Sequence, residues 1–401
     1  MNERDRLWKE RQNKKTEREK RGGSFGQIMI KKPLLAGFAG QRPHIFPNGA
    51  TVMENETLSK VLMCMQCGMC TGGCPEAGIT PFNIRQLVRK KQLDRALDKA
   101  IPWYCTSCGE CTLRCPRDVK PSEMIVEVRS AFVEDGQIPL SIQKALENTF
   151  VQKNPWGRPR SKRAAWQEEA GIEVPHIGEV ESGRLLFTCC IEAYDPRCMV
   201  IPQNVAAILQ KAGMDFGVLG VEEACCGNEI RRMGELGLFE ELQEENTATF
   251  EKYGVKEIIA LSPHCMNALK NEYGDIGVKV FHYTEVLAKM IKEGTVNFKV
   301  PYNKKVIYHD PCFLGKQNKI FDEPRDILRA VEGLELLEFS ASRENSLCCE
   351  GGGGRMFYEA EITYTRNSEK RVLEAIKKGA EEIVTSCPFC LMNLEDPAKE
   401  R

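Results

Sequence analysis

The sequence predicts a mixed α+β and α/β fold, with a helical N-terminal domain followed by two repeated α/β halves. The first observation is that two tight cysteine runs lie among helical patterns in residues 51–135. The second is that short β-rich runs alternate with helical stretches from about residue 183 onward. Such alternation is typical of parallel α/β units. The third is that this second part of the chain repeats itself.

Length and composition limit the class of protein. The 401 residues suffice for about two or three domains with sizeable cores. A net charge of −1 gives no electrostatic footprint for nucleic acid, and no apolar run is long enough to predict a membrane span. The charged N-terminus lacks a signal-peptide core, so we expect a cytoplasmic protein or one that is peripheral on the cytoplasmic face of a membrane complex. Nineteen cysteines in such a chain favour metal ligation over a disulfide framework.

Five segments are expected along the chain. The first is an extended arm that needs a partner surface to be ordered and would serve as a docking clamp. The segments are the arm (1–50), the domain of the two cysteine runs (51–135), a linker (136–182), and the two repeats (183–300 and 301–395). Within the second segment, residues 84–101 space their apolar side chains as one helix does.

The two repeats keep their cysteines aligned. RLLFTCC (184–190) matches KVIYHDPC (305–312), and EEACCGNEIRRM (222–233) matches NSLCCEGGGGRM (345–356). EIIALSPHCMNAL (257–269) matches EIVTSCPFCLMNL (382–394). A repeat that preserves such positions indicates that they share a role. The aligned pairs are Cys189 with Cys312, Cys225 with Cys348, Cys226 with Cys349 and Cys265 with Cys390.

The two cysteine runs of the N-terminal domain are ferredoxin-like. CMQCGMCTGGCP and CTSCGECTLRCP both have the spacing C-x2-C-x2-C-x3-C-P of bacterial ferredoxins, which bind cubane [4Fe–4S] clusters. A tight loop can wrap three corners of a cubane but not all four, so the fourth thiolate comes from the other run. We expect one cluster on Cys64, Cys67, Cys70 and Cys115, and the other on Cys105, Cys108, Cys111 and Cys74. Such clusters pass single electrons and break no bonds themselves.

The second repeat has one thiol more than a cubane needs. Its five cysteines are expected to converge from loops at strand ends; they are Cys312, Cys348, Cys349, Cys387 and Cys390. The extra thiol and the adjacent pair indicate an unusual iron–sulfur core in which a sulfur bridges irons. Four glycines, Gly351 to Gly354, follow the pair and would let the backbone approach that core or leave room for a substrate.

These motifs resemble a known family. The arrangement C…CC(G)…CxxC, with HDPC before it, resembles the "CCG" cysteine-rich domain of heterodisulfide reductases, and the two N-terminal runs resemble the small two-cubane subunit of the same enzymes. The chain looks like a fusion of the two over about residues 55–395. The resemblance implies that the five cysteines of the second repeat hold a noncubane [4Fe–4S] cluster that cleaves a disulfide.

The first repeat departs from this pattern. Ser262 stands where the second repeat has Cys387, and Cys190 is an extra thiol beside Cys189. Several interpretations stay open. Cys189, Cys225, Cys226 and Cys265 could hold a cubane or a zinc ion. Cys190 could substitute for the missing ligand, or this half could be a scaffold without metal.

Other residues carry weaker signals. His309 and Asp310 precede the ligand Cys312, so either could deliver a proton to a leaving thiolate, although capping of the HDP turn explains them as well. His264 could replace a thiol ligand, but a local hydrogen bond is the simpler interpretation. His282 is expected to be structural at a strand-to-helix junction, and Cys198 to be a plain buried thiol. No motif predicts a flavin or nucleotide site.

Three functions compete. The first is an iron–sulfur oxidoreductase subunit of a heterodisulfide-reductase-like complex, in which electrons pass through two cubanes to a noncubane cluster that reduces a small-molecule or protein disulfide. The second is an electron-transfer-only subunit of a flavin-linked hydroxy-acid oxidase or a quinone-linked membrane complex. The third, a zinc or assembly scaffold, does not explain the eight ferredoxin-type cysteines. In the first two, the electron partner is a flavoprotein or a membrane cytochrome subunit.

Overall fold

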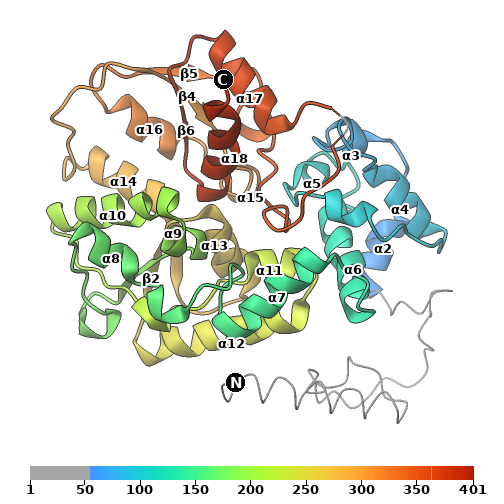
Figure 1. Ribbon diagram of the computed structural model, residues 1–401, viewed down its shortest axis with the longest axis horizontal. Helices are drawn as coiled ribbons and strands as arrows, with labels where there is room; N and C mark the ends of the chain where they lie inside the picture. Colours follow the sequence, from blue (N-terminus) through green and yellow to red (C-terminus); the bar gives the residue numbers. More distant parts are fainter. Residues whose placement is uncertain (1–54, 363) are drawn as a thin grey trace.

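The computed structural model describes residues 55–362 and 364–401, and the predicted arm (1–50) lies outside them. The fold is mixed helix and strand, as the sequence predicts (Figure 1). Helices of the N-terminal region, drawn in blue, lie beside two α/β parts, drawn in green to yellow and in orange to red. None of the described helices is long and apolar enough to cross a membrane.

Helices form the N-terminal region around the two cysteine runs. They are α2 (Asn55–Leu62), α3 (Met69–Gly72), α4 (Ile84–Gln92), α5 (Glu110–Leu113) and α6 (Pro121–Glu134). The Asn83 side chain caps α4 by accepting a hydrogen bond from the backbone N–H of Gln86. The single helix predicted over 84–101 is wrong in its second half. Asp94 adopts a left-handed φ of 49°, so the chain turns away after Gln92.

The segment 136–182, predicted as a linker, is folded instead. It contains α7 (Leu140–Gln152) and α8 (Ala165–Ala170). Ile142 and Ala145 lie on one face of α7 and are buried in the same core as the first repeat. The apolar spacing of α7 is the signal that would have predicted a packed helix rather than a linker.

The first repeat is built on a parallel sheet of order β1-β2-β3, with strands β1 (Arg184–Phe187), β2 (Glu257–Ala260) and β3 (Lys279–His282). Gly217 adds a parallel bridge to the free edge of β1. The helices are α9 (Cys190–Tyr194), α10 (Pro196–Lys211), α11 (Asn228–Arg232), α12 (Leu236–Lys252), α13 (Pro263–Asn267) and α14 (Tyr283–Lys292). His282 ends β3 and caps α14, which is the strand-to-helix junction predicted for it.

The second repeat has a parallel sheet of order β5-β4-β6, with strands β4 (Lys305–His309), β5 (Glu335–Glu338) and β6 (Glu382–Thr385). Its helices are α15 (Gly315–Asn318), α16 (Glu323–Arg329), α17 (Asn367–Lys377) and α18 (Pro388–Lys399). The prediction of parallel α/β units is thereby confirmed. Helices α14 and α16 pack against each other and connect the two repeats.

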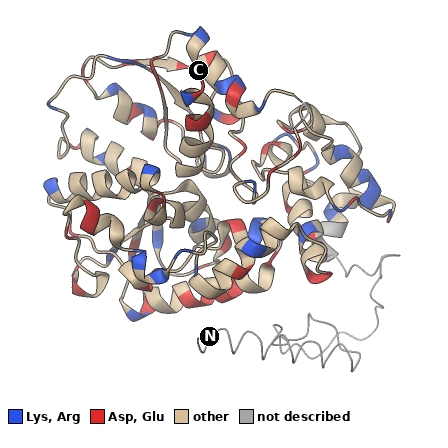
Figure 2. Ribbon diagram, viewed as in Figure 1, with Lys and Arg blue, Asp and Glu red and all other residues tan. Residues whose placement is uncertain are grey.

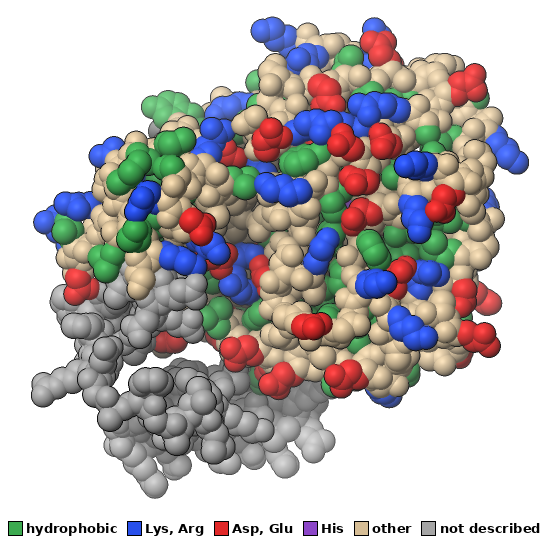
Figure 3. All heavy atoms as spheres, turned by 180° about the vertical axis from the view of Figure 1, so that it is seen from behind, with side chains coloured by type: hydrophobic (Ala, Val, Ile, Leu, Met, Phe, Trp, Pro, Cys, Tyr) green, Lys and Arg blue, Asp and Glu red, His purple; other side chains and the backbone are tan. Residues whose placement is uncertain are grey.

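Charge is distributed without a single dominant sign. Figure 2 shows Lys and Arg residues on α4 and acidic residues along α12. Seen from behind, the molecule mixes charges of both signs with hydrophobic side chains (Figure 3). This distribution agrees with the net charge of −1.

A buried arginine of α6 joins the three parts of the chain. Arg129 is fully buried and donates hydrogen bonds to the carbonyl oxygens of Pro102 and Cys105 in the N-terminal region. It also donates to the carbonyls of Arg232 in the first repeat (2.7 Å) and Gly353 in the second (2.9 Å). One side chain therefore fixes how the cysteine runs sit against both repeats.

Candidate metal centres

The N-terminal cysteines gather in the two sets expected from their spacing. A cavity is lined by Cys64, Cys67, Cys70 and Cys115, so the last cysteine of the second run lies with three of the first. Cys74 lies in turn beside Cys105 and Cys108, and Cys111 is close to all three of these. Each set offers four thiols, the number that a cubane takes, so the donors present fit such clusters.

Strand ends and helix starts place the thiols of the second repeat. Cys387 follows β6 and is the N-cap of α18, with Pro388 in the first turn and Cys390 further along it. Cys312 follows β4. The carboxyl ends of neighbouring parallel strands meet at one edge of a sheet, which is why these side chains converge. The Cys349 and Cys390 sulfurs are 3.1 Å apart.

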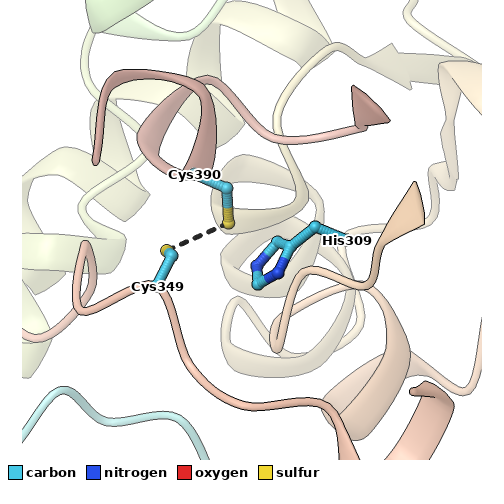
Figure 4. Close-up of side chains that lie close together, drawn as sticks. All are labelled: His309, Cys349 and Cys390. Atoms are coloured by element: carbon cyan, nitrogen blue, oxygen red, sulfur yellow. Dashed lines mark hydrogen bonds between the residues drawn. The ribbon is translucent and has the colours of Figure 1, made fainter. Parts of the chain in front are cut away.

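His309 lies at this group of thiols. Its ring nitrogen and the sulfurs of Cys349 and Cys390 all lie within 4.8 Å of one another (Figure 4). Burial lowers the pKa of His309, although a hydrogen bond with Cys349 acts in the opposite direction. Contacts with Cys348 and Cys390 hold the pKa of Cys349 well below its usual range. A neutral imidazole therefore faces a thiol that ionises easily.

Asp310, the other candidate proton donor, forms a buried ion pair with Arg325. Both of its carboxylate oxygens accept hydrogen bonds from the buried Arg325, at 2.7 and 2.9 Å. The backbone N–H of Arg343 donates to the same carboxylate. The Asp310 carboxylate is therefore held in a long-range buried ion pair and makes no local cap of the HDP turn.

His264 of the first repeat reaches the thiols of the second. Its Nδ1 lies 2.9 Å from a carboxylate oxygen of Glu229, and its ring stacks on Phe389 at 4.2 Å between centroids. Burial opposes its charge, but hydrogen bonds with Cys387 and Glu229 raise its pKa to about 10. Burial likewise opposes ionisation of Cys387, yet contacts with Cys390 and His264 lower its pKa to about 6. The pair is an imidazolium beside a thiolate.

The second cysteine run touches the second repeat directly. Cys108 and Cys348 are in side-chain contact, and the Cys348 sulfur lies 3.6 Å from the Thr106 hydroxyl. Lys316 of α15 is buried against the second cysteine run, where it pairs with the Glu110 carboxylate. These contacts leave the two groups of thiols with no intervening protein layer.

The glycine run explains how this contact is possible. Gly353 has a left-handed φ of 68°, and a Cβ there would lie 2.6 Å from the carbonyl oxygen of Cys105. A Cβ on Gly352 would lie 2.8 Å from the carbonyl oxygen of Thr106. The glycines therefore let the loop that follows the cysteine pair approach the backbone of the second cysteine run.

The first repeat also gathers five thiols, including one outside the aligned positions. Cys225, Cys226 and Cys265 lie together, and Cys189 and Cys190 both join them. Ser262 is the N-cap of α13, where its hydroxyl accepts from the N–H of His264. The thiol of Cys198 is buried at the Pro388 carbonyl (3.9 Å), as expected for a plain buried thiol.

Sequence reasoning missed three buried groups that shape these sites. Arg163 donates to the Cys190 sulfur at 3.3 Å, but it lies in a stretch that the sequence marks only as basic. Lys316 and the contact of His264 with Cys387 were missed because their partners lie far away in the chain. A fourth buried group, Arg129, did leave a signal, because it is a charged residue within the largely apolar run MIVEVRSAFV.

Comparison with known proteins matches the chain to two domain families. The 4Fe-4S dicluster domain matches residues 60–119, and the cysteine-rich (CCG) domain matches residues 185–270 and 306–395. The EtfAB:quinone oxidoreductase of Syntrophomonas wolfei is 39% identical over 311 residues, covering 74% of this chain and 43% of that protein. The chain thus spans about half the length of such relatives.

Two archaeal relatives are matched over more of their length. A subunit of the dihydromethanophenazine:CoB–CoM heterodisulfide reductase of Methanosarcina barkeri is 27% identical, covering 89% of this chain and 93% of that protein. An uncharacterised iron–sulfur protein of Methanococcus maripaludis is 30% identical, covering 84% and 68%. The chain therefore belongs to the family of iron–sulfur proteins, this heterodisulfide reductase subunit among them, that combine a 4Fe–4S dicluster domain with cysteine-rich domains.

Proposed function

We propose that this chain is the iron–sulfur subunit of a heterodisulfide-reductase-like oxidoreductase, with its substrate site in the second repeat. When bound, the clusters would supply an electron route from two cubanes to a noncubane [4Fe–4S] cluster, where a disulfide takes up two electrons and two protons to give two thiols. The cubane ligands are the two N-terminal sets. The ligands in the second repeat are Cys312, Cys348, Cys349, Cys387 and Cys390.

The observation that carries the proposal is the contact between Cys108 and Cys348. One sulfur belongs to a cubane ligand set and the other to the five-thiol set. Electron transfer needs short separations, and this contact supplies one without an intervening residue. The buried hydrophobic cluster of Cys108, Cys312, Phe313 and Cys348 keeps water from the gap.

The residues around the five thiols supply charge and a proton site. Lys316 places a positive charge near Cys108 and Cys312, where thiolates carry negative charge. His309 holds a ring nitrogen at Cys349, which is the place where a proton would be needed when a substrate sulfur leaves as a thiolate. His264 holds Cys387 in its thiolate form through a hydrogen bond.

A second candidate, electron transfer without a bond-breaking step in this chain, is favoured by one observation. The five thiols of the second repeat are each at most 8% exposed, so a disulfide would have to open a path to reach them. A relay subunit needs no such path. In that case the partner would be a flavoprotein or a quinone-linked membrane subunit, in line with the name of the Syntrophomonas relative.

Electron paramagnetic resonance on the oxidised protein distinguishes the two. Under disulfide reduction, adding thiol substrates produces a paramagnetic thiol-bound signal, and Cys348→Ser abolishes it. The matched control is Cys198→Ser, which removes a buried thiol outside both groups. Oxidised protein that gives no signal with any thiol, together with reduced protein that gives only cubane signals, in wild type and variants alike, would establish the relay function instead.

A further inference from the structure

We propose that the first repeat holds its own iron–sulfur cluster on five thiols, and that Cys190, which lies outside the repeated motif, completes the set. The kind of cluster is taken from the function proposed above for the second repeat. The grouping of the thiols is independent of it. The argument rests on the order in which the sulfurs contact one another in the two repeats.

In the second repeat the contacts form one unbranched series. Cys312 contacts Cys348, Cys348 contacts its chain neighbour Cys349, and Cys349 contacts Cys390. Cys390 then contacts Cys387. The adjacent pair therefore occupies the middle, and one thiol from β4 and one from β6 form the two ends.

In the first repeat the contacts form the same series with a different assignment of ends. Cys190 contacts Cys225, and the pair partner Cys226 contacts Cys265. Cys265 then contacts Cys189. By position in the series, Cys190 takes the place of Cys312, and Cys189 takes the place of Cys387. Backbone hydrogen bonds also show that Cys225 and Cys348 occupy equivalent places. The N–H of Gly227 donates to the Cys225 sulfur at 3.4 Å, and the N–H of Glu350 donates to the Cys348 sulfur at 3.3 Å.

Local structure explains why Ser262 is tolerated. It sits where a thiol ligand would be, but its hydroxyl caps α13, so the helix start keeps its hydrogen bond. The missing thiol comes from the neighbouring strand. Strand β1 pairs in parallel with β2, so the chain leaving β1 at Phe187 ends at the same sheet edge as the chain leaving β2 at Ala260. Cys189 can therefore reach Cys265 from the side.

The surroundings fit an anionic cluster. Arg163 lies 3.3 Å from the Cys190 sulfur and is itself 2% exposed, and its guanidinium pairs with Glu223 at 2.6 Å. A buried cation that contacts one sulfur stabilises negative charge on the whole set. A zinc ion takes four ligands, which would leave one of the five thiols unused beside that cation. An iron–sulfur cluster of the kind proposed for the second repeat would use all five.

Metal analysis of the anaerobically purified full chain tests the inference. We expect about sixteen irons per chain, about four for each of four clusters, and no stoichiometric zinc. Cys190→Ser should lose about four irons and about four sulfides while the reduced cubane signals persist, showing an intact fold. Cys198→Ser, the matched control, should lose none.

Two results would overturn the inference. Wild-type protein with about twelve irons, or with one zinc per chain, excludes a cluster in the first repeat. Unchanged iron and sulfide in Cys190→Ser exclude this thiol as a ligand. The disulfide-reduction proposal is tested on Cys348→Ser, so the two can fail separately.

Discussion

Replacing Arg129 by methionine should weaken the whole assembly of cysteine runs and repeats. Arg129 donates five hydrogen bonds to four buried carbonyls, those of Pro102, Cys105, Arg232 and Gly353. Methionine fills much of the same volume but donates none. Each buried acceptor left without a donor costs about 1–3 kcal/mol.

The net effect is smaller than that sum, because the variant no longer buries a guanidinium. Burial lowers the pKa of Arg129 to about 10, so the group is charged at neutral pH and its own burial is unfavourable. Four unpaired acceptors would cost about 4–12 kcal/mol, and removal of the buried charge reduces this to a net destabilisation of about 3–5 kcal/mol. The loss falls on contacts between the three parts of the chain rather than within one.

The assay is the first-order loss of iron–sulfur absorption in guanidinium chloride without oxygen. A barrier lowered by about 3 kcal/mol speeds this loss about a hundredfold, and contacts partly kept in the transition state reduce the factor to no less than about ten. Arg89→Met, which removes an exposed arginine of α4, is the matched control. Rates within about twofold of wild type would refute the role of Arg129 as the connection among the parts.

Three further variants test neighbouring features. Gly353→Ala should destabilise the protein by about 1–3 kcal/mol more than Gly379→Ala in guanidinium unfolding. Both glycines have a positive φ, but only at Gly353 would the added Cβ collide with backbone atoms, so equal unfolding midpoints would contradict this reasoning. Lys316→Met should make the reduction potential of the nearby centre more negative in a titration monitored by electron paramagnetic resonance, because a positive charge is lost. It should also destabilise the protein by about 3 kcal/mol, because Glu110 loses its buried partner. The control Lys319→Met, at an exposed position, should do neither. His282 is held neutral, since burial lowers its pKa to about 3 against about 6.5 in the unfolded chain. Acidification from pH 6.5 to 5.5 should therefore lower the free energy of unfolding of wild type by up to about 1.4 kcal/mol more than that of His282→Asn. Parallel pH profiles of the two proteins would exclude this titration.

Much of the fold followed from local sequence signals. The parallel sheets are predicted by short β-rich runs, and the grouping of the N-terminal cysteines by ferredoxin spacing. The packed α7 was missed because the basic stretch NPWGRPRSKR (154–163) that follows it is typical of a linker. The helix predicted over 84–101 is too long because the apolar spacing continues past Asp94, where the chain turns with a left-handed backbone. A periodic pattern gives no information on such a break.

The arrangement of the thiols could be predicted only as far as the repeat aligned them. Alignment pairs Cys189 with Cys312, but the contacts put Cys190 in that place and Cys189 at the other end of the series. The exchange depends on two strands ending at the same sheet edge, a relation between residues far apart in the chain. The same holds for the glycines after Cys349, whose purpose appears only when the backbone of Thr106 is placed against them. Through that approach, one adjacent cysteine pair contacts Cys108 on one side and Cys390 on the other, so it joins the N-terminal cysteine runs to the second repeat.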